Sequence, residues 1–114
     1  MREFTYKLKE LVNEEKNPFS GTVVLKLPKF TERNNLLREI SFKRNQVNEA
    51  DVTTNLEVLE KLVKIVQDHV LKVDVKKGEK QFLTLDELEY DFHFSLFVLD
   101  VGMVIVQGID LGNV

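Results

Sequence analysis

The longest regular hydrophobic pattern in the chain lies in residues 51–73. Its apolar residues recur at steps of three and four, which places them on one side of an α-helix. Thr54 with Glu57 three residues later is typical of a helix start, and Asp51 is a competing cap. The pattern predicts a central amphipathic helix about 30 Å long at 1.5 Å per residue. Its apolar stripe consists of Val52, Leu56, Leu59, Leu62, Val63, Val66, Val70 and Val73.

A second apolar run begins at Phe92 and continues to the end of the chain. Pattern alone does not distinguish a buried strand from a buried helix here, but the run is too long for an ordinary strand. We expect a C-terminal apolar helix to about Gln107, ended by Gly108. A helix start at Thr84, with Glu87 three residues later, precedes this run. The phenylalanines at positions 92, 94 and 97 are interpreted as core residues.

The hydrophobic patterns in the N-terminal half of the chain are shorter. Residues 1–17 fit either a strand, in which Phe4, Tyr6 and Leu8 alternate, or a helix with Phe4, Leu8, Leu11 and Val12 on one face. Residues 22–28, TVVLKLP, predict a strand that lies at a sheet edge or ends abruptly at Pro28. A short helix is expected over about 32–40 after Thr31, then a polar loop over 41–50. Residues 73–83 fit either a small hairpin or a polar connector.

These elements predict a mostly α fold of the α+β class. It would be a small helical domain with the long central helix, the C-terminal apolar helix and a short N-terminal β element. The 114 residues fit a single domain over residues 1–114.

Composition limits the classes of protein that fit. Apolar residues make up 43% and charged residues 31% of the chain, which is ordinary for a globular domain. The absence of cysteine excludes disulfides, thiolate metal sites and cysteine nucleophiles. The charged N-terminus does not resemble a signal peptide. The most apolar stretch, residues 92–106, is interrupted by His93, Ser95 and Asp100 and is shorter than the roughly 20 residues that span a bilayer. We expect no membrane segment.

Charge is distributed unevenly. The net charge is −3, and residues 81–114 contain six Asp/Glu and no Lys or Arg. Such a chain does not suit a nucleic-acid binder, which needs a concentrated basic face. An acidic, apolar C-terminal third indicates a protein partner or self-association instead. The basic residues of the N-terminal half are interpreted as part of a mixed solvated surface: Lys26, Lys29, Arg33, Arg38, Lys43 and Arg44.

Residues suited to catalysis or metal binding are sparse. Asp86, Glu89 and His93, at steps of three and four, would offer two carboxylates and an imidazole on one helix face. Acidic residues at a helix start have a simpler electrostatic explanation, and His69 is interpreted as a packed or half-exposed histidine. Neither phosphate-binding glycine spacing nor a Gly-x-Ser-x-Gly elbow occurs. These motifs therefore do not support an enzyme, although catalytic groups can converge from distant positions. We expect no catalytic residue, metal or cofactor; carboxylates among Asp86, Glu89 and Asp91 would be the candidates for catalysis.

The order of several segments resembles a known family. These are VVLKLPKFTERNNLLREI, LEKLVKIV, LTLDELEYD and a closing GIDLGN, at residues 23–40, 59–66, 83–91 and 108–113. Over about residues 22–113 the chain resembles the tail assembly chaperones of long-tailed bacteriophages. The most specific pieces are LPKFTER, LDELEYD and LGN.

This resemblance implies a mostly helical, non-enzymatic protein. It would bind the long, aggregation-prone tape measure protein, keep it soluble and recruit tail tube subunits around it. It would act in the host cytoplasm, leave before the tail is finished and be absent from the mature virion. Such genes commonly also give a longer, frameshifted product. Neither nucleic acid nor a membrane is expected as a partner.

Hydrophobicity beyond what a small monomer needs suggests a binding surface. Val58, Ile65 and Leu71 lie away from the main stripe of the central helix, and the C-terminal helix is apolar on more than one side. We predict that the C-terminal helix meets the client, or another copy of the chain, through Phe94, Phe97, Val98, Val101 and Ile105. The alternative is that both helices are buried against the N-terminal strand and helix. A second functional hypothesis is a small phage accessory domain that binds and inhibits a host protein through its acidic C-terminal third.

Overall fold

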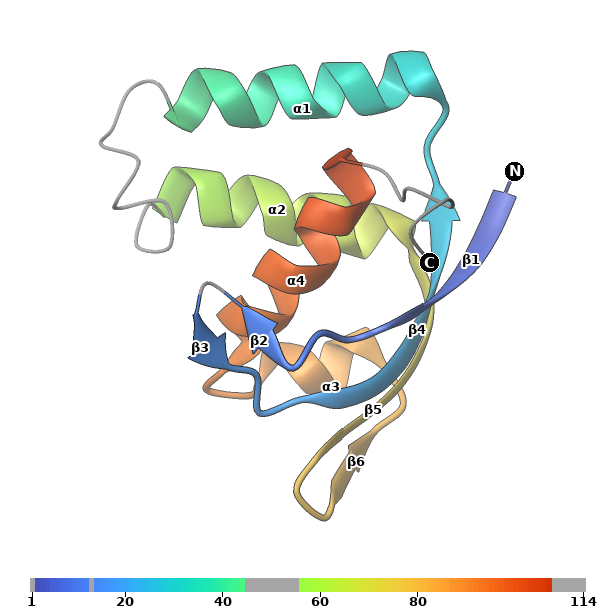
Figure 1. Ribbon diagram of the computed structural model, residues 1–114, viewed down its shortest axis with the longest axis vertical. Helices are drawn as coiled ribbons and strands as arrows, with labels where there is room; N and C mark the ends of the chain where they lie inside the picture. Colours follow the sequence, from blue (N-terminus) through green and yellow to red (C-terminus); the bar gives the residue numbers. More distant parts are fainter. Residues whose placement is uncertain (1, 13, 45–55, 108–114) are drawn as a thin grey trace.

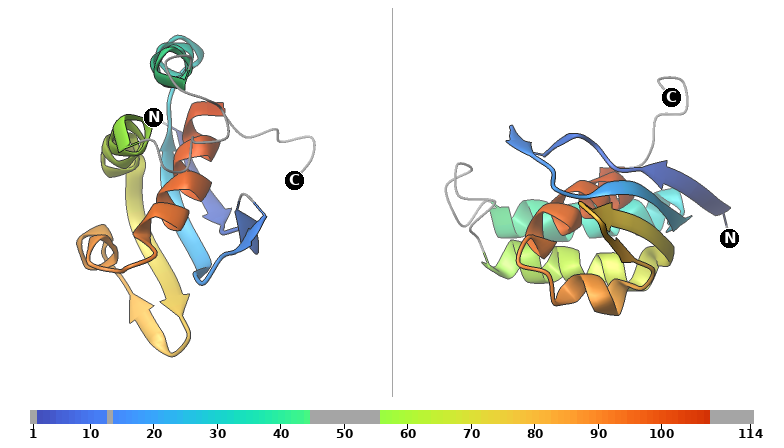
Figure 2. Two further views of the ribbon diagram at one scale, coloured as in Figure 1. Left: turned by 90° about the vertical axis from the view of Figure 1, so that its left-hand side faces the viewer. Right: turned by 90° about the horizontal axis from the view of Figure 1, so that it is seen from below.

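The computed structural model describes residues 2–12, 14–44 and 56–107, and its main feature is a four-stranded antiparallel sheet with helices on one side (Figures 1 and 2). The strand order is β1-β4-β5-β6, and β2 and β3 form a separate two-stranded hairpin. The expectation of a mostly α fold with only a short N-terminal β element is therefore wrong. The elements are β1 (Arg2–Lys7), β2 (Leu11–Val12), β3 (Glu15–Lys16), β4 (Ser20–Leu27), α1 (Phe30–Arg44), α2 (Leu56–His69), β5 (Val70–Lys77), β6 (Lys80–Phe82), α3 (Leu85–Glu89) and α4 (Phe94–Gln107).

The sheet has one face packed on helices and one polar face. Tyr6, Val23 and Val73 lie opposite one another on β1, β4 and β5, and the two valines are buried. The neighbouring row, which contains Thr5 and Lys72, points the other way because successive side chains of a strand alternate between faces. This alternation is typical of an antiparallel sheet with one solvated face.

The N-terminal strand resolves an ambiguity left by the sequence. Residues 2–7 are β1, so the alternation of Phe4, Tyr6 and Leu8 was the correct signal and the helical interpretation was wrong. The strand predicted over 22–28 is β4, which ends at Leu27 before Pro28 as expected. It does not lie at an edge, because β1 and β5 pair with it on either side.

The central helix is shorter than predicted. Helix α2 ends at His69, and Val70 and Val73 belong to β5, because the alternating, valine-rich sequence that follows His69 pairs with β4. The buried face of α2 is also rotated from the predicted stripe: Val58 and Ile65 are in the core, while Leu56 is exposed. Of the three side chains interpreted as surplus, Val58 and Ile65 are therefore core residues, whereas Leu71 is exposed on β5. The predicted cap at Thr54, with Asp51, lies outside the described residues.

The helix expected over 32–40 is α1, which is longer at both ends and continues into the segment expected to be a loop.

Between β5 and β6 the chain forms the hairpin rather than the polar connector. Gly78 in its turn has φ +62°, a conformation that glycine adopts without the steric cost of a Cβ. The helix start at Thr84 is confirmed, because its Oγ1 accepts the Glu87 N–H at 3.2 Å. Helix α4 extends to Gln107 as predicted, and Gly108 lies outside the described residues.

Aromatic packing joins the sheet to α4 in the centre of the core. The buried ring of Phe19 makes edge contacts with Phe82 of β6 and Phe97 of α4, each with ring centroids 6.1 Å apart. Phe19 directly precedes β4, so three segments distant in sequence meet at one side chain. Within the described ranges, no helix is both long and apolar enough to cross a membrane.

Candidate protein-binding site

Helix α4 is the most buried helix of the domain, and this bears on the surface predicted from the sequence. The side chains of Phe97, Val98, Val101 and Ile105 are fully buried, and Phe94 is half-buried with its ring stacked on Phe97. These residues contribute to the chain's own core because α4 packs against α1, α2 and β2. In this conformation the predicted set does not form an exposed surface, and the alternative of a buried helix describes it better.

Gly102 explains how closely α2 and α4 approach. A Cβ atom at this position would lie 3.0 Å from Cδ2 of Leu62, which is itself fully buried. Gly102, although it interrupts the apolar run of α4, is therefore a packing position. It lets the backbone of α4 lie against the side chains of α2.

A buried carboxylate on α4 holds the N-terminal strand. Asp100 is 3% exposed, and its Oδ1 accepts a hydrogen bond from the Tyr6 hydroxyl at 2.6 Å. Its Oδ2 accepts the Lys9 backbone N–H at 2.9 Å. Burial raises the pKa of Asp100, with these hydrogen bonds opposing the rise, and burial together with the bond to Asp100 raises the pKa of Tyr6. Both oxygens are occupied, so this arrangement suits a structural anchor rather than a reactive site.

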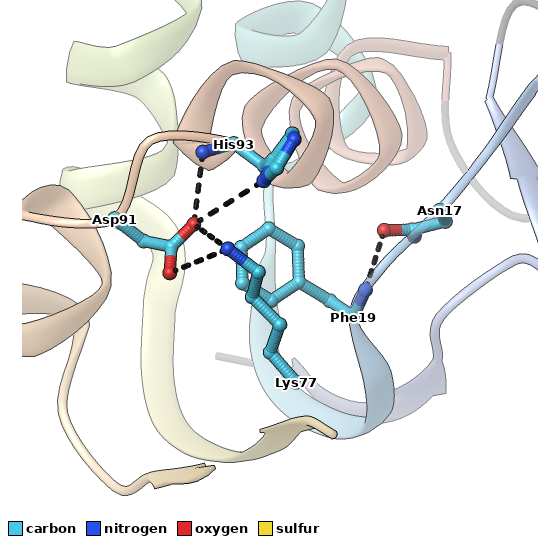
Figure 3. Close-up of polar contacts among 5 residues, drawn as sticks. All are labelled: Asn17, Phe19, Lys77, Asp91 and His93. Carbon is cyan, nitrogen blue, oxygen red and sulfur yellow. Dashed lines mark hydrogen bonds and ion pairs between the residues drawn. The ribbon is translucent and has the colours of Figure 1, made fainter. Parts of the chain in front are cut away.

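The connection between α3 and α4 is a tight turn held by Asp91 (Figure 3). Both carboxylate oxygens of Asp91 accept hydrogen bonds from Lys77 Nζ, at 3.0 and 3.1 Å, and Oδ1 also accepts the His93 N–H at 2.8 Å. The Asp91 N–H donates to the Leu88 carbonyl, and the Phe94 N–H donates to the Asp91 carbonyl. These bonds fix the backbone on both sides of Asp91 and tie the turn to β5.

The ionised form of the Asp91 carboxylate is stabilised by its hydrogen bonds and by the charge of Lys77. Its side chain is only 9% exposed, and such burial alone would raise the pKa of Asp91. The hydrogen bonds from His93 N–H and Lys77, with the positive charge of Lys77, outweigh this effect and lower the pKa overall. Asp91 is therefore ionised at neutral pH and keeps the turn in one conformation.

The rigid turn presents two aromatic side chains to solvent. Tyr90 is 89% exposed and Phe92 is 91% exposed, on either side of the half-buried Asp91. The Phe92 ring touches the ring of His93 edge to face, with centroids 5.2 Å apart. The prediction that Phe92 is a core residue is therefore wrong, because α3 ends at Glu89 and the chain reverses at Asp91 before α4 begins. Exposed aromatic rings on a fixed backbone are typical of protein-binding hot spots.

Acidic side chains lie just before these aromatic residues. Asp86, Glu87 and Glu89 of α3 are exposed, and Glu89 accepts a hydrogen bond from Gln67 of α2 at 2.6 Å. The turn thus presents two exposed aromatic side chains, Tyr90 and Phe92, next to the negative charges of α3. A complementary partner would offer an apolar surface with basic residues around it.

The possible metal ligands noted in the sequence do not share a helix face. Asp86 and Glu89 belong to α3, whereas His93 follows the turn, 3.9 Å from Asp91 through its Nδ1. In the three described ranges, no group of three His, Asp or Glu side chains is arranged to hold a metal ion. His69 is a packed histidine: its Nδ1 donates to the Ile65 carbonyl at 2.8 Å, and its Nε2 lies 3.6 Å from Glu32.

Comparison with known proteins gave no match to any family model, curated protein or solved structure.

Sequence reasoning missed the aromatic turn and the Tyr6–Asp100 anchor for different reasons. A signal for the turn exists, because Asp91 lies between the two aromatic residues just after a short acidic helix. Nothing local signals the anchor, since Tyr6 and Asp100 are 94 positions apart.

Proposed function

We propose that this chain is a non-enzymatic tail assembly chaperone that binds a phage tape measure protein, keeps it soluble and recruits tail tube subunits. The phage assignment rests on the resemblance of residues 22–113 to that family. The protein-binding role is supported by the exposed aromatic turn. One of the most specific pieces of the resemblance, LDELEYD at residues 85–91, covers α3 and the first half of this turn.

The single observation that carries the binding role is the exposure of Tyr90 and Phe92 on a backbone that Asp91 fixes. Two large apolar rings in water are unfavourable for a free protein, and burial in a partner would recover that free energy. Because the turn is already ordered, little conformational entropy is lost when it binds. We therefore propose that the client contact is made by Tyr90 and Phe92 rather than by α4.

A chaperone of this kind needs a client segment that is apolar and otherwise aggregates. The acidic residues of α3 favour a segment with lysine or arginine beside its apolar positions. Binding would take place in the host cytoplasm, and the chain would be released before the virion is complete.

Co-expression with the tape measure protein of the same genome tests the proposal. We expect the wild-type chain to keep the tape measure protein in the soluble fraction and to co-purify with it. The Tyr90→Ser, Phe92→Ser double variant should lose both effects while remaining folded. Phe30→Ser is the matched control, because Phe30 is an exposed aromatic residue at the start of α1, remote from the turn (Figure 1). A tape measure protein that aggregates equally with and without the folded wild-type chain would contradict the proposal.

The acidic surround of the turn also favours a second candidate, an accessory domain that covers a basic site on a host protein. This function predicts binding that weakens strongly with salt, because exposed opposite charges are screened within about 10 Å at 0.1 M ionic strength. Capture of a host enzyme that salt releases, together with no effect on the tape measure protein, would favour this candidate over the chaperone.

A further inference from the structure

The outer edge of β1 carries backbone groups that no described strand uses. β1 pairs with β4 along its whole length and is the first strand in the sheet order. The Leu8 N–H donates to the Gly21 carbonyl at 3.0 Å, in continuation of the register that pairs Lys7 with Thr22. Backbone groups of an antiparallel strand alternate in direction, so every second residue before Leu8 also bonds to β4. The intervening residues Glu3, Thr5 and Lys7 therefore direct their N–H and C=O groups away from the sheet.

This edge is held in a fixed conformation. The Tyr6 hydroxyl and the Lys9 N–H both donate to the buried Asp100, which ties β1 and the residues after it to α4. An ordered strand with free donors and acceptors is a template for a further strand. Its pairing would cost little additional ordering.

We propose that two copies of this chain join edge to edge through β1, antiparallel, with a two-fold axis between the two Thr5 residues. In this register Thr5 pairs with the partner's Thr5, and Glu3 pairs with the partner's Lys7 at both ends. All three outward-directed residues of each strand then form hydrogen-bonded pairs. The result is one continuous sheet across the dimer, with β1 of each copy at its centre. This inference does not depend on the proposed function.

Charge and pairing select this register over its neighbours. With the two-fold axis at Phe4, Lys7 has no opposing residue within the partner's β1. With the axis at Tyr6, Glu3 lies beyond the end of the partner's β1. Among pairs in which both residues belong to β1, the Thr5 axis sets the opposite charges of Glu3 and Lys7 directly across from each other, twice by symmetry. On the helix-covered face the same register brings Phe4 next to the partner's Tyr6, an aromatic pair across strands.

Glu3 and Lys7 offer a charge-swap test that is specific to the dimer. Within one strand they are four residues apart, about 13 Å at 3.3 Å per residue, which is too far for an ion pair. Glu3→Lys would set two lysines opposite each other at both ends of the interface, and Lys7→Glu would set two glutamates there. The double variant would restore opposite charges.

Sedimentation velocity over a concentration series measures the effect. We expect a wild-type dimer, a dissociation constant raised about tenfold or more by either single change, and recovery to within about threefold in the double variant. Circular dichroism checks that each variant is folded. A wild-type chain that stays monomeric up to millimolar concentration, or a double variant as weak as the singles, would overturn the proposal.

Amide hydrogen exchange supplies an independent readout on the unmodified chain. The N–H groups of Glu3, Thr5 and Lys7 should become protected as concentration rises, whereas those of Phe4 and Tyr6 should be protected throughout by β4. Exchange of the Thr5 amide at the same rate in dilute and concentrated samples would contradict pairing through β1.

Discussion

Asp100, which is buried, and Asp91, which is half-buried, hold different parts of the fold together. Asp100 joins α4 to the N-terminal strand through the Tyr6 hydroxyl and the Lys9 N–H, and Asp91 joins the α3–α4 turn to β5 through Lys77. Each carboxylate accepts more than one hydrogen bond, which offsets the free energy lost when it leaves water. The fold around the candidate site therefore depends on a few polar contacts as well as on the apolar core.

The Tyr6 hydroxyl gives the first test at the residue scale. Tyr6→Phe removes the donor to Asp100 Oδ1 and leaves a buried carboxylate oxygen without that bond, so the free energy of unfolding should fall by about 1–3 kcal/mol. Urea denaturation measures this change. Tyr90→Phe, at the exposed tyrosine, is the matched control and should change stability by less than about 0.5 kcal/mol. Equal effects of the two changes would argue against the anchor.

Asp91 gives a test that depends on pH. Its pKa is lowered in the folded state, so its stabilisation is present above the ordinary carboxyl pKa of about 4 and is lost as pH falls through the folded value. Asp91→Asn should lower the free energy of unfolding by about 1–2 kcal/mol at pH 7 and by progressively less below about pH 4. Repeating the change in a Lys77→Met background should show a smaller loss, because the ion pair is already absent. A loss independent of both pH and Lys77 would exclude this role for the charge.

Among the elements, local pattern identified α2, α4 and the β4 strand, but it gave α1 as a short helix and did not show the sheet. The apolar period of α2 was visible, whereas its end at His69 was not, because residues 70–73 continue the helical spacing while also alternating as a strand. Pairing with β4 makes residues 70–73 a strand, and pairing between distant segments cannot be predicted from a short stretch of sequence. For the same reason the sequence did not show that residues 2–7 form a strand of this sheet, because their partner strand, Ser20–Leu27, is distant in sequence.

Helix α4 shows why apolar residues on several sides do not by themselves indicate a surface. Its core position follows from contacts with α1, α2 and β2, which the sequence does not reveal. The exposed residues were missed for the opposite reason: Phe92 belongs to the same apolar run as Phe97 in sequence, but it precedes the first turn of α4. Hydrophobicity marks the apolar residues but does not separate the buried ones, such as Phe97, from the exposed ones, such as Phe92.

Two phenylalanines five positions apart test this assignment. Phe97 is fully buried, so Phe97→Ala should lower the free energy of unfolding by about 3–5 kcal/mol through lost contacts and a cavity. Phe92 is exposed, and Phe92→Ala should change the free energy of unfolding by less than about 0.5 kcal/mol. Thermal or urea unfolding compares them directly. A small loss at Phe97 with a large loss at Phe92 would mean that α4 begins in a different position.

At the scale of the whole molecule, the domain separates its stable parts from its exposed ones. The sheet, α2 and α4 form the core, and the α3–α4 turn projects two aromatic rings from it without contributing to that core. The β1 edge is distant from the turn in the sheet order, since α3 contacts β5 and β6 at the other edge. A dimer through β1 would therefore leave both turns free to bind a client.

The role of the α3–α4 turn in client binding is tested by the affinity of the purified chain for a soluble tape measure segment, compared among single variants by titration calorimetry. We predict that Phe92→Ala weakens binding at least about tenfold, as expected for an aromatic hot-spot residue, while Phe30→Ala leaves it within about twofold. Both variants should unfold at the wild-type temperature. Unchanged affinity in Phe92→Ala, or an equal loss in Phe30→Ala, would contradict the assignment of the binding site to the α3–α4 turn.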